Sequence, residues 1–97
     1  MGLRLEKGFI FTNEFMETNV NGIYAAGDIT GEPMLEALAA KEGTVATINA
    51  FTNAKAKISK NEIPKAIFTD PEVATVGLTD AEAHGKGLKC ACNTLPL

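Results

Sequence analysis

Residues 22–28, GIYAAGD, lead into a helical pattern that begins at Pro33. The first stretch is apolar and bounded by glycines, which is typical of a short strand buried in a sheet. Pro33 suits the first turn of a helix, because the N–H that proline lacks has no partner there. Leu38, Glu42 and Val45 then recur at helical spacing. The sequence therefore predicts a strand, a turn and a helix in succession, within an α/β or α+β fold.

The end of the predicted strand carries a candidate binding site. Ligands of open α/β sheets bind at the carboxyl ends of strands. Gly27 allows a close approach of backbone or ligand, and the carboxylate of Asp28 can accept hydrogen bonds from sugar or polyol hydroxyls. The N–H groups at the start of the helix can hold an electron-rich oxygen. The residues alone leave open the alternative that Asp28 only caps a turn.

Composition excludes several classes of protein. The chain has 97 residues, of which 45% are hydrophobic and 22% charged, so it is expected to fold as about one small domain. A net charge of -3 disfavours a nucleic-acid partner. The sequence contains neither a membrane-spanning apolar run nor a basic-then-apolar signal peptide, so we expect no membrane association and a cytoplasmic location. A single histidine excludes a multi-histidine metal site within the chain.

The remaining segments are short. Residues 3–8 predict a turn, and residues 8–12 a short strand. Residues 53–62 are polar and rich in lysine, which indicates an exposed linker or a domain boundary.

The second half of the chain returns to strand-like sequence. Residues 66–69 and 73–77 predict two strands on either side of a turn at an Asp-Pro pair. Thr79 and Glu82 have the spacing of a capping box at the start of a short helix. Residues 88–95 predict one more strand.

Several motifs together carry a family resemblance. Residues 18–28, TNVNGIYAAGD, resemble the second flavin-binding motif of the pyridine nucleotide-disulfide oxidoreductases. The similarity continues through Pro-Met-Leu at 33–35 and Glu-Gly at 42–43, and resumes at residues 63–77. Within that family the segment 68–77 is most similar to the mercuric reductases and next to the dihydrolipoamide dehydrogenases.

The resemblance implies a division of the chain and a cofactor. Residues 1–53 would be the C-terminal segment of a Rossmann-like FAD-binding domain, 54–62 a linker, and 63–97 the first part of an α+β interface domain. This domain implies a homo-oligomer. FAD is the implied cofactor, and its contacts fall on five residues: Gly27, Asp28, Met34, Leu35 and Glu36.

The chain lacks other motifs of the family. Neither Gly-x-Gly-x-x-Gly fingerprint is present, and neither are the redox-active cysteine pair and the C-terminal histidine. We therefore expect no catalytic residue and no NAD(P)H site here, and interpret the chain as a piece of such an oxidoreductase. The alternative is a non-catalytic remnant that folds or oligomerises without flavin. In either case an uncovered strand edge at 23–26 predicts a dimer or larger, or marginal stability.

The two cysteines allow two interpretations. On a strand, Cys90 and Cys92 would face the same side and could share a soft metal such as Hg(II) or Cu(I). The favoured interpretation is that they are reduced cysteines that pack as small hydrophobes, with no metal bound. His84 is expected to be a solvated residue near a helix end.

Overall fold

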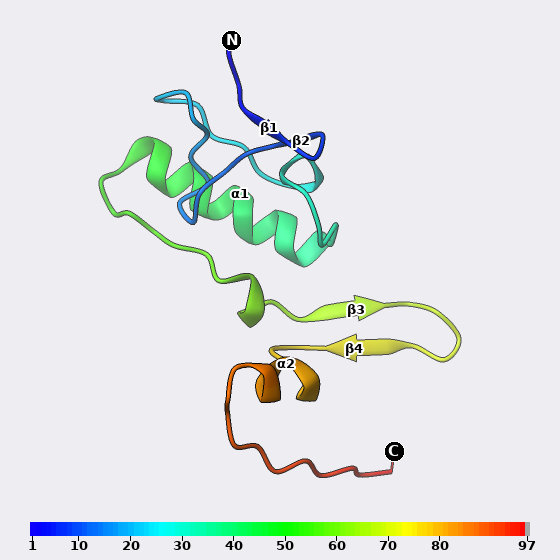
Figure 1. The fold of residues 1–97 in the computed structure, drawn as a ribbon. Coiled ribbons are helices and arrows are strands. Elements are labelled where there is room, and N and C mark those ends of the chain that lie inside the picture. The colour runs from blue at the N-terminus through cyan, green and yellow to red at the C-terminus, as the bar shows by residue number, and fades with distance from the viewer. Residues whose placement is uncertain (97) are drawn as a thin grey trace.

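The computed structural model describes residues 1–96, so Leu97, the last residue of the predicted interface segment 63–97, lies outside the described residues. Two α-helices, two 3-10 turns and two small antiparallel sheets make up a mixed α/β structure (Figure 1). The elements are β1 (Leu5–Glu6), β2 (Phe9–Ile10), η1 (Asp28–Thr30), α1 (Glu36–Phe51), η2 (Lys60–Glu62), β3 (Lys65–Ile67), β4 (Val73–Thr75) and α2 (Asp80–Gly85).

Helix α1 supplies most of the core. Its sequence is rich in alanine, a strong helix former, and Leu38, Glu42 and Val45 fall on one face. These three residues are buried, and the side chain of Met16 packs into the same core from the N-terminal loops. The helical pattern predicted from Pro33 is therefore confirmed, with the helix itself beginning at Glu36.

The N-terminal loops are fastened to α1 near its C-terminal end. Asn49 donates through Nδ2 to the carbonyl of Phe15 at 2.9 Å, and the hydroxyl of Tyr24 donates to the carbonyl of Asn49 at 3.1 Å. Asn49 also exchanges two hydrogen bonds with the backbone of Ala56. The start of the predicted linker is therefore held against α1.

The strand predicted at residues 8–12 is present as β2, whereas the turn predicted at residues 3–8 is confined to Lys7 and Gly8, because residues 5–6 form β1. Strand β1 pairs with β2, and the two are joined through Lys7 and Gly8. Both joining residues have positive φ, 51° and 84°, as a type I′ hairpin turn requires.

The strand predicted at residues 23–26 is not formed in the structure. The segment makes one isolated bridge, between Glu17 and Tyr24, and it has no strand ladder. Its N–H groups instead reach loop and side-chain acceptors: Ala25 donates to the carbonyl of Met16, and Gly27 donates to Glu42. A strand buried in a sheet is held by hydrogen bonds to neighbouring strands. Among residues 1–96 no strand lies alongside this segment to pair with it.

The C-terminal half contains the expected hairpin and capped helix. Strands β3 and β4 pair antiparallel, with Lys65 opposite Thr75 and Ile67 opposite Val73. The capping box at the start of α2 is confirmed, because the hydroxyl of Thr79 accepts from the N–H of Glu82, and the carboxylate of Glu82 accepts from the N–H of Thr79.

The strand predicted at residues 88–95 is not formed. This segment runs as irregular chain, and no described strand lies beside it to complete a ladder. Its course is instead set by the end of α2, from which it turns back.

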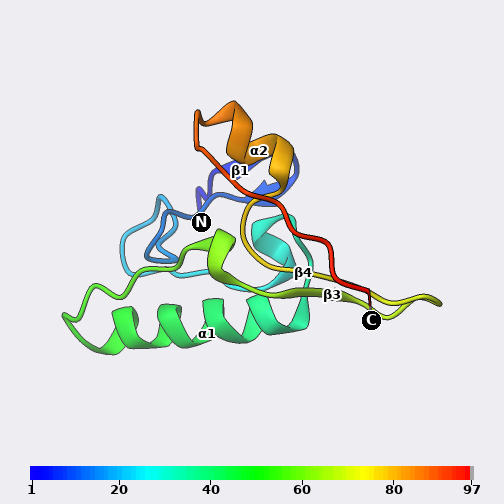
Figure 2. The ribbon, with the colours of Figure 1, turned by 90° about the horizontal axis from the view of Figure 1, so that it is seen from below.

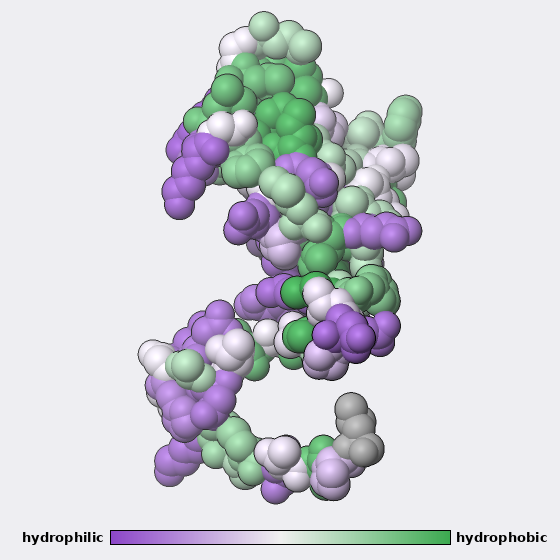
Figure 3. Space-filling model, turned by 90° about the vertical axis from the view of Figure 1, so that its right-hand side faces the viewer, coloured by the Kyte–Doolittle hydropathy of each residue, from purple (hydrophilic) through white to green (hydrophobic). Residues whose placement is uncertain are grey.

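The molecule leaves much of its apolar surface uncovered. Helix α1 lies against the N-terminal loops (Figures 1 and 2). The β3–β4 hairpin, α2 and the tail extend beyond them, in the lower half of Figure 1. The accessible surface is 7487 Å², against about 5,300 Å² for a compact monomer of this mass. The radius of gyration is 16.3 Å, against about 12.5 Å. Hydrophobic residues gather on the outer surface of the N-terminal half, and the C-terminal segment curves away (Figure 3).

In the described part of the chain, the helices are too short or too polar to cross a lipid bilayer.

Candidate functional site

A tight turn precedes α1, and a buried carboxylate holds it. Gly27 has φ 88°, a conformation that glycine adopts without strain, and the 3-10 turn η1 follows directly. The N–H of Gly27 donates to Oε2 of Glu42 at 2.7 Å. The hydroxyl of Thr30 lies 3.2 Å from the same oxygen and 2.9 Å from the carbonyl of Gly27. Glu42 thus ties the turn to the helix that it precedes.

The turn presents Asp28 to solvent. Asp28 opens η1, and its side chain is exposed, while Glu42 and Thr30 make the side-chain hydrogen bonds that hold the turn. The alternative in which Asp28 merely caps the turn therefore has no support in the described geometry. The carboxylate remains available to an external hydroxyl.

The start of α1 is also open. Leu35 is the N-cap in extended conformation, and no side chain caps the helix there. The first N–H groups of the helix therefore belong to Glu36 and the two residues after it. Met34 is half exposed and lies before the helix. The Asp28 turn itself lies against the N-terminal half of α1, where Gly27 is next to Ala39 and bonds to Glu42.

Sequence reasoning assigned no role to Glu42. It is 1% exposed and shares the buried face of α1 with Leu38 and Val45. The sequence does contain a signal for this role, because a charged residue in the apolar stripe of a helix requires buried hydrogen-bonding partners. The partners are a backbone N–H and a hydroxyl, with Lys60 Nζ at 3.9 Å from Oε1.

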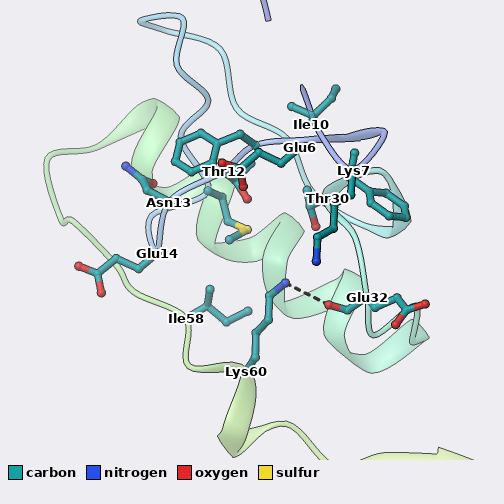
Figure 4. A pocket seen from close by; sticks show the side chains of 13 residues that line it. Glu6, Lys7, Ile10, Thr12, Asn13, Glu14, Thr30, Glu32, Ile58 and Lys60 are labelled. Atoms are coloured by element: carbon teal, nitrogen blue, oxygen red, sulfur yellow. Dashed lines mark hydrogen bonds between the residues drawn. The ribbon is translucent and has the colours of Figure 1, made fainter. Parts of the chain in front are cut away.

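An open hollow of about 960 Å³ lies beside this turn (Figure 4). Thr30 and Glu32 line one side, and the β1–β2 hairpin and following loop line another. Lys60 extends across it, and its Nζ donates to the carbonyl of Glu32 at 3.5 Å. The five residues predicted to contact flavin do not line this hollow, so it is a separate feature of the surface.

A second group of polar side chains gathers at α2. The thiols of Cys90 and Cys92 both donate to Oδ1 of Asp80, at 3.1 and 3.0 Å. Hydrogen bonds from Cys92 and Cys90 lower the pKa of Asp80, and the contact with Asp80 raises the pKa of the Cys92 thiol. The exposed ring of His84 lies 3.5 Å from both Asp80 and Cys90, which agrees with its predicted place near the helix end.

Comparison with known families divides the chain in two. Residues 1–43 match the model of the pyridine nucleotide-disulphide oxidoreductases, and residues 63–97 match the dimerisation domain of the same family. The chain belongs to the pyridine nucleotide-disulphide oxidoreductases. In this family member, the Asp28 turn and the start of α1 fall within the first match, and the β3–β4 hairpin and α2 fall within the second.

Individual relatives of this chain include proteins of two kinds. A mercuric reductase of Staphylococcus aureus is 45% identical over 92 residues, which are 95% of this chain and 17% of the relative. A mercuric reductase of Shigella flexneri is 45% identical over 91 residues, 94% of this chain and 16% of the relative. Dihydrolipoyl dehydrogenase 3 of Haloarcula marismortui is 45% identical over 82 residues, 84% of this chain and 17% of the relative. The chain thus spans about a sixth of the length of the curated relatives that it matches.

Proposed function

We propose that this chain supplies part of the FAD site of an NAD(P)H-dependent disulfide oxidoreductase of the mercuric reductase type. In this proposal residues 1–53 are the C-terminal segment of a Rossmann-like FAD-binding domain, residues 54–62 are a linker, and residues 63–97 begin the interface domain. The observation that carries the proposal is the turn at Gly27, which is fastened to Glu42 of α1 and presents the exposed carboxylate of Asp28, and which is followed in the chain by the uncapped start of α1 at Glu36.

These groups suit the polar part of a flavin. The Asp28 carboxylate would accept a hydrogen bond from a hydroxyl of the ribityl chain, and Gly27 would let that chain pass close to the backbone. Met34, Leu35 and Glu36 would place the start of α1 against the pyrimidine carbonyl. N–H groups at a helix N-terminus favour an oxygen that gains negative charge, so they would stabilise the reduced cofactor. Bound FAD would supply the hydride and electron chemistry.

The type of oxidoreductase is inferred from the relatives. Two mercuric reductases match 94–95% of this chain at 45% identity, which supports the mercuric reductase type. A dihydrolipoyl dehydrogenase type is the second candidate, because a relative of that name reaches the same identity over 84% of the chain. No contact with a substrate is proposed for any residue of this chain, so the choice between the two types rests on the relatives alone.

The flavin proposal is tested by titrating the purified chain with FAD and following the visible spectrum and the quenching of flavin fluorescence. We expect saturable binding, weakened in Asp28→Ala by about tenfold or more, the value of one hydrogen bond to a charged acceptor. Asp70→Ala is the matched control, because Asp70 is an exposed aspartate in the loop between β3 and β4.

Two results would contradict this proposal. If the chain shows no saturable FAD binding, the flavin-binding motif binds no cofactor here, and the chain is a non-catalytic remnant. If FAD binds but Asp28→Ala and Asp70→Ala behave alike, the assignment of Asp28 is wrong.

We also propose that the chain forms a homo-oligomer through its C-terminal half. The match to a dimerisation domain covers residues 63–97, where Phe68 and Val76 are 84% and 63% exposed. Apolar surface of this kind is commonly covered by a partner. Sedimentation velocity should show association that Phe68→Asp weakens. Phe51→Asp is the matched control, since Phe51 is 85% exposed but lies on α1. A monomeric chain, or equal effects of both variants, would refute this interface.

A further inference from the structure

The most concentrated set of metal-ligating side chains lies away from the proposed flavin residues, at the start of α2. Asp80, Cys90 and Cys92 each offer one ligand atom, and these atoms all lie within 4.8 Å of one another. Both sulfurs face the same carboxylate oxygen, at 3.1 and 3.0 Å. One carboxylate and two thiols therefore converge on one point.

The end of α2 explains why these residues meet. The N–H of Leu88 donates to the carbonyl of Ala83, and the N–H of Gly87 donates to the carbonyl of His84. These two bonds define a Schellman motif, and Gly87 occupies its left-handed position with φ 72°. The motif reverses the chain, so residues 88–92 run back along the helix toward its first residue, Asp80.

The spacing of the cysteines completes the convergence. Cys90 and Cys92 are separated by one residue, Ala91, and both thiols face α2. Their contacts with a single oxygen of Asp80 confirm this orientation.

We propose that Asp80, Cys90 and Cys92 form a binding site for a thiophilic divalent cation of the Zn²⁺ and Cd²⁺ class. Two thiolates select soft or borderline metals, and a carboxylate is an accepted companion ligand of zinc. With metal–ligand bonds of about 2.0–2.3 Å, neighbouring ligand atoms around a four-coordinate ion lie roughly 3.3–3.8 Å apart. The two sulfur–oxygen separations, 3.1 and 3.0 Å, are slightly shorter because the protonated thiols hydrogen-bond to Asp80 directly, and a small outward movement admits the ion.

His84 supports the same site from the next turn of α2. Its Nδ1 lies 3.5 Å from Oδ1 of Asp80, and its Nε2 lies 3.5 Å from Sγ of Cys90. An imidazole beside a ligating carboxylate orients that ligand. The site is exposed, so a cation can enter from solvent without any rearrangement of the core.

Binding is tested with the reduced chain and with Co²⁺ as a spectroscopic probe, followed by competition with Zn²⁺. Thiolate ligation of Co²⁺ produces a charge-transfer absorption that hydrogen-bonded thiols do not produce. We expect one Co²⁺ per chain, displaced by Zn²⁺, with the charge-transfer band lost in Cys90→Ser and in Cys92→Ser. Asp80→Asn should weaken Co²⁺ binding by at least about tenfold, because losing a direct ligand costs no less than losing an outer-shell partner, which costs about 10–100-fold. Asp70→Asn is the matched control and should bind as the unchanged chain does.

The outcomes separate this proposal from its rivals. Failure of Asp80→Asn to weaken binding would show a two-cysteine chelate and overturn the proposed site. One cation per two chains would show cross-linking of cysteines between molecules, and would overturn it equally. A circular dichroism spectrum shared by all variants establishes that they fold alike. If Asp80→Asn unfolds, Asp80→Ala replaces it, because alanine also removes the carboxylate ligand and the same loss of affinity is expected. The FAD titration has an independent readout, so either proposal can fail alone.

Discussion

Replacing Glu42 with alanine is expected to destabilise the chain by roughly 3 kcal/mol. The substitution removes the acceptor of the Gly27 N–H, at 2.7 Å, and one acceptor of the Thr30 hydroxyl, at 3.2 Å. Thr30 keeps its bond to the carbonyl of Gly27, so its share of the loss is small. The N–H of Gly27 loses a hydrogen bond to a charged group, which is worth about 1.5–3 kcal/mol. Loss of the buried side-chain packing adds about 1 kcal/mol.

The size of this loss makes it measurable. A domain of this length has a free energy of unfolding of about 5–15 kcal/mol, so the variant should lose a large part of it. Urea unfolding can be followed by far-ultraviolet circular dichroism and by the fluorescence of Tyr24, the only tyrosine, whose hydroxyl bonds to α1. Glu42→Gln keeps an acceptor oxygen and should lose only about 1 kcal/mol.

Lys41→Ala is the matched control for this experiment. Lys41 precedes Glu42 on α1 but is exposed, and substitutions of exposed residues usually change stability by less than about 0.5 kcal/mol. If Glu42→Ala unfolds at the same urea concentration as Lys41→Ala, the buried carboxylate does not hold the turn. The account of how Asp28 is presented would then be wrong as well.

Two further predictions concern α2. Hydrogen bonds from the N–H and hydroxyl of Thr79 hold the pKa of Glu82 below its usual value of 4.5, so the cap should persist at neutral pH and be lost as the pH falls through the folded-state pKa. Amide exchange of Thr79 by NMR should show this loss, and Glu82→Gln should abolish the pH dependence. The contact with Asp80 raises the pKa of Cys92, so Asp80→Asn should lower that pKa and speed alkylation of Cys92 at mildly alkaline pH. An unchanged or slower rate in a Cys90→Ser background would contradict the assignment.

Local features of this fold were predictable from sequence. The capping box at Thr79 and Glu82 was confirmed because both partners lie within four residues and need no tertiary support. The hairpin on either side of residues 68–72 was confirmed in the same way, although its strands are shorter than predicted. The helix at 36–51 follows from periodicity, and its first residue differs from the predicted start because a helix end depends on its cap.

Features that depend on distant partners were not predictable. The strand expected at 23–26 requires a neighbouring strand, and the loop acceptors at Met16 and Glu42 satisfied its N–H groups instead. The role of Glu42 depends on burial, which periodicity indicates but does not measure. The meeting of Asp80 with the two cysteines depends on the reversal at Gly87, for which glycine just beyond a helix is the available signal.

The placement of hydrogen bonds along the chain also predicts an order of folding. The strand pairs join neighbours in sequence, and closing such short loops takes microseconds or less. The bonds that fasten α1 to the N-terminal loops span 34 residues from Asn49 to Phe15 and 25 residues from Tyr24 to Asn49. Loop-closure entropy must be overcome before contacts of this separation contribute. We therefore expect hairpins and helices to form first, and docking of α1 onto the N-terminal loops to limit the rate at which the core assembles.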